Sequence, residues 1–300
     1  MDKYIRTDLA LELKEDIGEK SHLDGVEIST NYISDSLKET IIEVVNQQGA
    51  KLLGKPIGTY ITLESGKLRG TDTSIHKPMV ELLHKHLKKL LGAKNKILVI
   101  GLGNRAITPD ALGPFVVDNL YITRHLLSEG IISNTKEISA ICPGVMGQTG
   151  IETSTILKAL IREINPEMII AIDALAAREP SRLNSTIQIC DTGINPGAGV
   201  GNNRIKLDEE SLGVKVLAIG VPTVISMPAI INQALEGMLS MFLDNPRDNI
   251  HELTDDEKYK ISCELLSREL TTMFVTPKNI DEAVKKVSYT ISEAINKFFE

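Results

Sequence analysis

The sequence has little cysteine, no excess of basic residues and no long apolar run, and each absence excludes a class of protein. Its three cysteines, Cys142, Cys190 and Cys263, are odd in number and widely spaced, which indicates neither a disulfide framework nor a CxxC metal site. A net charge of −7 argues against a general nucleic-acid binder, which usually carries basic excess. No apolar run approaches the roughly 18 residues of a membrane span, and the N-terminus (MDKYIRTDLALELKED) is too polar for a signal peptide. We therefore expect a cytoplasmic protein with no membrane contact and no direct nucleic-acid binding.

The chain also lacks the signatures of serine and cysteine hydrolases. It contains no G-x-S-x-G elbow, and no cysteine lies near a suitable histidine, so nucleophilic mechanisms of those types have no support. His84 and His86 fall among lysines of a predicted amphipathic helix, where side chains at i and i+2 diverge. We interpret these two histidines as part of the solvated face of the helix. The sequence predicts neither a bound metal ion nor a cofactor.

One short motif favours a nucleotide, but its surroundings do not. Gly101-Leu-Gly103-Asn-Arg-Ala106 follows a predicted strand and matches the G-x-G-x-x-A form of the dinucleotide fingerprint. In a true fingerprint a helix begins almost at once, so that its N-terminus meets the pyrophosphate. Here Pro109 and Gly113-Pro114 intervene. A tight turn that leads into the following loop is the favoured interpretation.

From Lys96 onwards the pattern alternates between apolar runs and helical segments. Apolar runs without alternation are typical of strands that are covered on both faces; they predict strands over 96–100, 137–142, 167–172, 186–190 and 214–219. Helices are expected over 114–128, 151–164, 228–242, 255–271 and 277–298, the last with Thr276 as its cap and Pro277 at its first position. The sequence thus predicts an α/β fold with a mostly parallel central sheet flanked by helices.

The N-terminal third is expected to pack on that core. Alternation predicts strands over 25–34 and 58–63, and helical spacing predicts helices over 35–48 and 78–91. We therefore expect a single domain in which residues 9–95 pack on a core formed by residues 96–300.

Two aspartates follow apolar runs at places where a parallel sheet collects its ligands. Asp173 closes the run EMIIAID, and Asp110 lies in the loop after KILVIGLG. Because strand C-termini form the ligand-binding edge of such a sheet, two acids far apart in the sequence can converge there. Burial of a lone carboxylate is costly unless it is paired or protonated. A charged acid beside a protonated one is also what proton-transfer hydrolysis requires, although a turn or cap role for Asp110 is the structural alternative.

Several long and uncommon strings closely resemble the germination protease family of endospore-forming bacteria. They span most of residues 4–300 and comprise RTDLALE, GLGN-x(3)-TPDALGP, VDNLYITRHL, PGVMGQTGIETS, NPEMIIAIDALAAR, NSTIQICDTGINPGAGVGN, AIGVPTVI and MFVTPKNID. The resemblance implies an α/β fold similar to that of the hydrogenase-maturation peptidases. It also implies an atypical aspartic endopeptidase whose two aspartates, in TPDALGP and IDALAA, are Asp110 and Asp173.

The same resemblance implies a substrate, a maturation step and a location. The family degrades the small acid-soluble proteins that coat spore DNA, and its members are zymogens that remove their own N-terminal propeptide. The RTD–LA motif places the processed bond at Asp8–Leu9, so that residues 1–8 would be the propeptide and 9–300 the catalytic domain. An acid before Leu-Ala is similar to the acid–hydrophobic–Ala sites that the family cuts. A homotetramer in the developing forespore and spore core is implied as well.

These elements together give a hypothesis for the mechanism. Asp110 and Asp173 would share a proton across a water molecule, the charged partner taking a proton from the attacking water and the protonated partner donating toward the substrate. Backbone N–H groups are the candidate oxyanion donors, at Gly101, Gly103, Asn104, Gly197 and Gly199. Two alternatives stay open. The same acids could hold a divalent ion in a metal-dependent peptidase, or GLGNRA and the glycine-rich loop 193–204 could form a non-enzymatic nucleotide-binding module.

Overall fold

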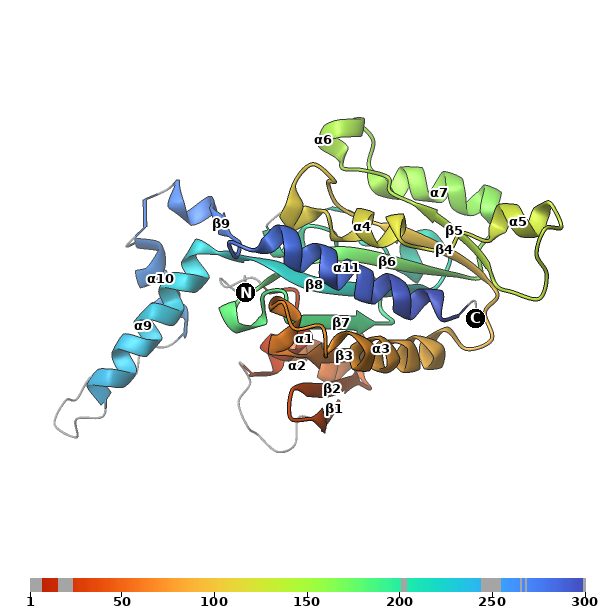
Figure 1. The fold of residues 1–300 in the computed structure, drawn as a ribbon. Helices are drawn as coiled ribbons and strands as arrows, with labels where there is room; N and C mark the ends of the chain where they lie inside the picture. Colours follow the sequence, from red (N-terminus) through yellow and green to blue (C-terminus); the bar gives the residue numbers. More distant parts are fainter. Residues whose placement is uncertain are drawn as a thin grey trace.

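A mixed β-sheet with helices on both faces forms the centre of the molecule (Figure 1). The structure is a computed structural model that describes residues 7–15, 24–200, 204–243, 255–264, 266–267 and 269–298. Within these residues nine strands join one sheet in the order β1-β2-β3-β7-β8-β6-β4-β5, with β9 paired to β8. The parallel strands are β4 (Lys96–Gly101), β5 (Glu137–Ile141), β6 (Met168–Ala177) and β8 (Val216–Ser226).

The remaining strands extend this parallel centre in antiparallel fashion. They are β1 (Val26–Ser34), β2 (Leu37–Val44), β3 (Gly58–Glu64), β7 (Thr186–Cys190) and the short β9 (Phe274–Val275). Since β3 pairs directly with β7, the strands before residue 96 and the strands after it share one sheet.

The two faces of the sheet have separate helical covers, because successive side chains of a strand point to opposite sides. Ile170 and Ile172 of β6 pack under α3 (His76–Leu91), α4 (Leu112–Asp118) and α11 (Ile280–Asn296). Ile169 and Ala171 face α7 (Thr153–Ile164) and α8 (Glu209–Leu212). On this second side α1 (Ala10–Glu15) and α2 (Gln47–Leu53) cover the antiparallel strands.

The other helices lie at the periphery. They are α5 (Arg124–Ser128), α6 (Met146–Thr149), α9 (Met227–Leu243) and α10 (Asp255–Glu264). Helices α9 and α10 extend away from one end of the sheet (Figure 1). No helix of the described part is both long and apolar enough to cross a membrane.

The predicted α/β class with helices flanking a central sheet is confirmed, and the structure corrects several details. The sheet is less parallel than expected, because β7 and the N-terminal strands join it antiparallel. The expected helix over 35–48 is largely strand β2, where the β-branched side chains of Thr40, Ile41, Ile42 and Val44 fit between β1 and β3. Glu39 of β2 pairs with His86 of α3. His86 is buried, so the prediction that it belongs to a solvated face is wrong.

Several predicted helices have different bounds, and the helix expected over 255–271 is α10, which covers only Asp255–Glu264. The helix expected over 114–128 is divided into α4 and α5, and Thr123 between them donates its hydroxyl to the carbonyl of Lys136. The last helix begins at Ile280 with Asn279 as its N-cap. Thr276 is not its cap, because the Thr276 hydroxyl donates to the carbonyl of Thr223, 2.8 Å away. It ties β9 to β8 instead.

Candidate active site

Asp173 lies inside β6, at the point where its neighbour β4 ends. Gly101 is the last β4 residue paired with β6, opposite Ile172, whereas β6 continues beside β8 as far as Ala177. The expectation that Asp173 closes its strand is therefore wrong. The carboxyl end of β4 still exposes Asp173 to the loop that leaves this strand, which is the ligand edge of an open parallel sheet.

Asp110 reaches this edge from the loop after β4. It ends the short 3-10 turn Thr108–Asp110, and its Oδ2 accepts a 2.7 Å hydrogen bond from the backbone N–H of Asn104. Gly103 has φ +104°, and a Cβ there would lie 2.0 Å from the carbonyl oxygen of Asp110. The loop can close on itself in this way only with glycine at position 103. Thr223 of β8 secures it further by donating to the carbonyl of Pro109 at 2.7 Å.

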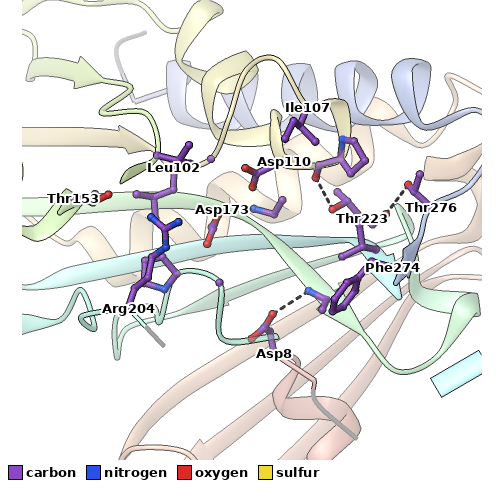
Figure 2. Close-up of a pocket in the computed structure, with 18 of the residues that line it drawn as sticks. Asp8, Leu102, Ile107, Asp110, Thr153, Asp173, Arg204, Thr223, Phe274 and Thr276 are labelled. Carbon is purple, nitrogen blue, oxygen red and sulfur yellow. Dashed lines mark hydrogen bonds between the residues drawn. The ribbon is translucent and has the colours of Figure 1, made fainter. Parts of the chain in front are cut away.

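The two carboxylates line one cavity of about 340 Å³ (Figure 2). Asp173 is only 5% exposed, and burial, reinforced by the negative charge of Asp110, raises its pKa well above the ordinary value. Burial also raises the pKa of Asp110, against the opposing hydrogen bond from Asn104. Two acids that interact in a poorly solvated cavity favour a state in which only one of them is charged.

Arg204 supplies a cation to the same cavity. Its side chain extends into the cavity on the side of Asp173 (Figure 2), and its charge lowers the pKa of both Asp110 and Asp173, against the larger effect of burial. Arg204 was missed in the sequence, where it appears only as the last residue of the glycine-rich loop 193–204. A lone arginine at the end of such a loop gives no local signal of what it will face.

Asp8 enters the cavity from the N-terminal segment (Figure 2). Its backbone N–H donates to the carbonyl of Ala176 at 3.2 Å, and its Oδ2 accepts from the Ala176 N–H at 2.9 Å. The Gly199 backbone N–H faces the same carboxylate and contributes to lowering its pKa. Burial raises the pKa of Asp8, while the two amides and the Lys55 charge oppose that shift.

Gly199 makes room for this carboxylate. A Cβ at Gly199 would lie 2.2 Å from Asp8 Oδ2 and 2.7 Å from the Cβ of Ala176.

The remaining candidate oxyanion donors have varied surroundings. Gly197 and Gly103 line the cavity, whereas Gly101 packs its backbone against Gly113 of α4. The turn at Gly101–Gly103 does not begin a helix of the kind that holds a dinucleotide.

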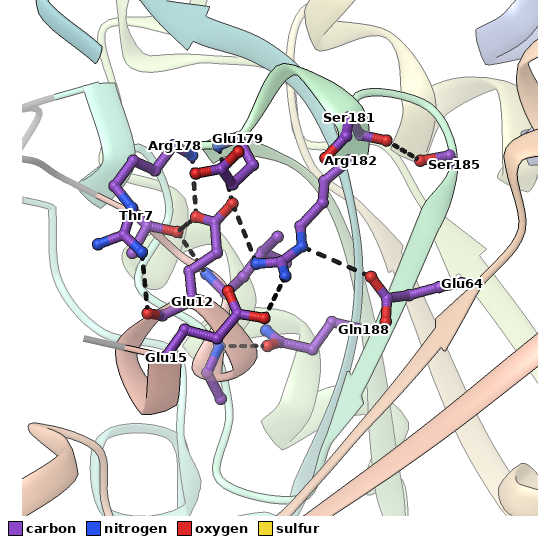
Figure 3. A network of polar contacts seen from close by, with 12 residues as sticks. Thr7, Glu12, Glu15, Glu64, Arg178, Glu179, Ser181, Arg182, Ser185 and Gln188 are labelled. Atoms are coloured by element: carbon purple, nitrogen blue, oxygen red, sulfur yellow. Dashed lines mark hydrogen bonds and ion pairs between the residues drawn. The ribbon is translucent and has the colours of Figure 1, made fainter. Parts of the chain in front are cut away.

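The residues that follow Asp8 are fastened to the body of the protein. Leu9 is fully buried, as is Ala10. The Glu12 carboxylate is buried as well, and it accepts hydrogen bonds from the N–H groups of Arg178 and Glu179 at 2.8 and 3.0 Å and from the Thr7 hydroxyl (Figure 3). Arg182 pairs with it at 3.4 Å. The segment 7–15 is therefore docked at the C-terminal end of β6, beside the cavity.

Glu12→Gln is expected to lower the free energy of unfolding by about 3 kcal/mol, because the amide presents an N–H group to surrounding donors and leaves Arg182 without its buried partner. Glu15→Gln is the matched control, since Glu15 contacts the same guanidinium at 2.6 Å from a side chain that is 39% exposed; a loss below about 1 kcal/mol is expected there. Urea unfolding measures both. Equal losses would show that Glu12 does not anchor the segment.

No three His, Cys, Asp or Glu side chains among the described residues are arranged as a set that could hold a metal ion. The cavity combines three acids, one arginine and backbone amides, which is a set of groups suited to proton transfer.

Known proteins with similar sequences identify the class of protein to which this chain belongs. A family model described as germination protease matches residues 6–249. The germination proteases of Clostridium tetani and of Caldanaerobacter subterraneus subsp. tengcongensis are 42% and 40% identical to this chain over 97% of its length, covering 94% and 93% of their own. That of Priestia megaterium is 36% identical over 97% of this chain and 92% of its own length.

These matches define the protein as a peptidase. More narrowly, the chain belongs to the germination protease family, whose members are proteases of spore germination. Among solved structures, the [NiFe] hydrogenase maturation protease HycI from Thermococcus kodakarensis KOD1 is similar at 15% identity and a TM-score of 0.36, covering 70% of this chain and 98% of its own. A likeness at that score carries no further conclusion.

Proposed function

We propose that this protease is an endopeptidase that degrades small acid-soluble spore proteins, with Asp110 and Asp173 as its catalytic pair. The observation that carries the proposal is the single cavity that both carboxylates line, together with the raised pKa of Asp173. The protonated acid donates toward the substrate while the charged acid activates water. Arg204 lines the same cavity, and its charge favours the ionised form of each acid, against the larger effect of burial.

The position of Asp8 supports cleavage after an acidic residue. Its carboxylate lies between the amides of Ala176 and Gly199 in the cavity of the catalytic pair, and backbone N–H groups are suitable donors to a carboxylate. A substrate acid would occupy the same place once the segment before Leu9 has left. We propose accordingly that residues 1–8 are a propeptide, and that the Asp8–Leu9 bond is the one removed.

Self-processing of this kind is intramolecular, since the segment occupies the cavity of its own chain. The new N-terminus of the processed chain would stay docked. Leu9 is buried, and the helix after it is anchored by the hydrogen bonds that Glu12 accepts from Arg178 and Glu179. Small acid-soluble proteins as substrates, assembly into a tetramer, and activity in the forespore and spore core complete the proposal on the grounds of family membership.

The test is to incubate the purified full chain and follow its N-terminus by mass spectrometry. A first-order conversion to a chain that begins at Leu9, with a rate independent of protein concentration, is expected. The processed protein should then cut a peptide with one Glu–Leu–Ala site and leave the Gln–Leu–Ala version intact. Stable residues 1–8 together with an uncut peptide would contradict the proposal.

A chelator separates this mechanism from a metal-dependent one that uses the same acids. Cleavage that is unchanged after dialysis against EDTA is the expected result, because protons rather than a Lewis acid perform the chemistry. Loss of cleavage that added Zn²⁺ or Mg²⁺ restores would favour the metal site instead.

A further inference from the structure

The carbonyl of the proposed cleavage bond is already held by a lysine. Lys55 Nζ donates to the backbone oxygen of Asp8 at 3.0 Å, and Gln188 Nε2 approaches the same oxygen at 3.3 Å. This contact does not belong to the catalytic pair: Lys55 lies in the loop after α2, where Gly54 in the left-handed conformation ends the helix. Neither residue stood out in the sequence.

Asp8 lies between two cavities that provide different chemistry. Its side chain lines the cavity of Asp110 and Asp173, and the residue also lines a second cavity of about 240 Å³ that contains Lys55 and Gln188. An attacking water activated by the acids would therefore come from one side, and donors for the carbonyl oxygen would come from the other. That division is what addition to a peptide carbonyl requires, because charge develops on the oxygen while the nucleophile bonds to the carbon.

Burial of the Lys55 ammonium costs free energy unless a negative charge lies beside it. Burial lowers the pKa of the Lys55 ammonium, against the opposing effect of the Asp8 charge. The Asp8 carboxylate is at the same time engaged by the amides of Ala176 and Gly199. A partly buried cation directed at a neutral carbonyl gains most when that oxygen becomes an anion, because its interaction then strengthens in the transition state.

We infer that Lys55, assisted by Gln188, is a catalytic residue that stabilises the oxyanion formed at the carbonyl before the cleaved bond. This inference rests on the proposed function. The charged member of the acid pair removes a proton from water, and the water oxygen bonds to the Asp8 carbonyl carbon. The carbonyl π electrons move to the oxygen, which Lys55 and Gln188 hold. When the C=O bond re-forms, the C–N bond breaks and the Leu9 nitrogen takes the proton of the other acid.

Gln188 links this site to the docked segment. While its Nε2 faces the Asp8 oxygen, its Oε1 accepts the Ala10 N–H at 2.7 Å. One amide therefore holds both the oxygen on one side of the bond and the peptide two residues further on. A substrate peptide can make the same backbone contact with any residue except proline at the corresponding position, because the donor is the main-chain N–H.

The test compares Lys55→Met with Lys206→Met in the full chain. Lys206 lines the same second cavity but pairs with Asp208 at 2.8 Å, so its removal controls for the loss of a cation there. The first-order rate of conversion to a chain that begins at Leu9 is expected to fall about 100-fold or more in Lys55→Met and to change less than about twofold in Lys206→Met. Lys55→Arg, which keeps a cationic donor, should recover most of the lost rate.

Hydrogen exchange of the Ala10 amide distinguishes catalysis from anchoring. If Lys55 only holds the segment in place, Lys55→Met would free this amide as it slows processing; the oxyanion role predicts slow processing with the amide still protected. Processing of Lys55→Met at the wild-type rate, or loss of Ala10 protection in step with the rate, would overturn the inference. Failure of the wild-type chain to process would instead overturn the proposed function, and the role of Lys55 with it.

Discussion

Asp173→Asn and Asp110→Asn are each expected to lower the rate of self-processing by about 1,000-fold or more, within the range that loss of an acid or base can reach. An amide at either position can neither take a proton from water nor give one to the leaving nitrogen, and its size leaves the cavity unchanged. The rate is measured by following the N-terminus of the chain. Asp118→Asn is the control: Asp118 pairs with Arg105 at the surface end of α4, so its rate should equal that of the wild type.

The stability of Asp173→Asn provides an independent check. Because the pKa of Asp173 is raised in the folded protein, the folded state binds this proton more tightly than the unfolded state, and the stability it contributes is lost as pH rises through the folded pKa. Asparagine has no charge to bury. The variant should therefore be more stable than the wild type at pH 7 by about 1 kcal/mol or more, and this advantage should vanish below about pH 3.9, the ordinary pKa of Asp.

Urea unfolding at both pH values measures this difference. A variant that is less stable than the wild type at pH 7 would show that the Asp173 carboxylate is well paired, and it would remove the basis for a raised pKa. A variant that still processes at the wild-type rate would end the case for the acid pair.

Gly199→Ala is expected to slow self-processing by about 100-fold, because misplacement of a reacting group by about 1 Å costs that much. The added Cβ would lie 2.2 Å from Asp8 Oδ2, and with Ala176 on its other side at 2.7 Å it has no space to relax without moving Asp8. Gly66→Ala is the matched control, since a Cβ there meets no atom within 4 Å.

The two glycine variants are compared in the same assay for the N-terminus. Gly66→Ala should process like the wild type, and both variants should melt within a few degrees of it, because the nearest neighbours of the Cβ added at the buried Gly199 are Asp8 and Ala176, and the substitution removes no core side chain. Wild-type processing by Gly199→Ala would show that the Asp8 carboxylate does not need its present place, and the proposed acidic preference would lose its structural support.

Much of the architecture could be predicted because it depends on local patterns. Uninterrupted apolar runs predicted the strands at Lys96, Glu137 and Thr186 to within a residue or two at each end, and the period of 3.6 predicted α3 and α7. The expected helix over 35–48 failed, since its apolar residues suit either period and only the pairing of β2 with β1 and β3 decides between them. Local patterns also could not show that β6 would extend beyond the carboxyl end of β4.

The candidate site, like the fold, could be predicted from the sequence only in part. The sequence by itself determined the membership of the family. It also predicted that Asp110 and Asp173 would lie at one edge of the sheet, because the apolar runs before them indicated strands whose carboxyl ends share that edge, although Asp173 lies within its strand. Only the tertiary structure decided what surrounds them. Asp8 meets Ala176 across 168 positions and Lys55 across 47, and such contacts depend on how separate elements pack rather than on any periodicity. The carbonyl oxygen that Lys55 holds is a backbone atom, which every residue has, so no sequence pattern could have singled it out.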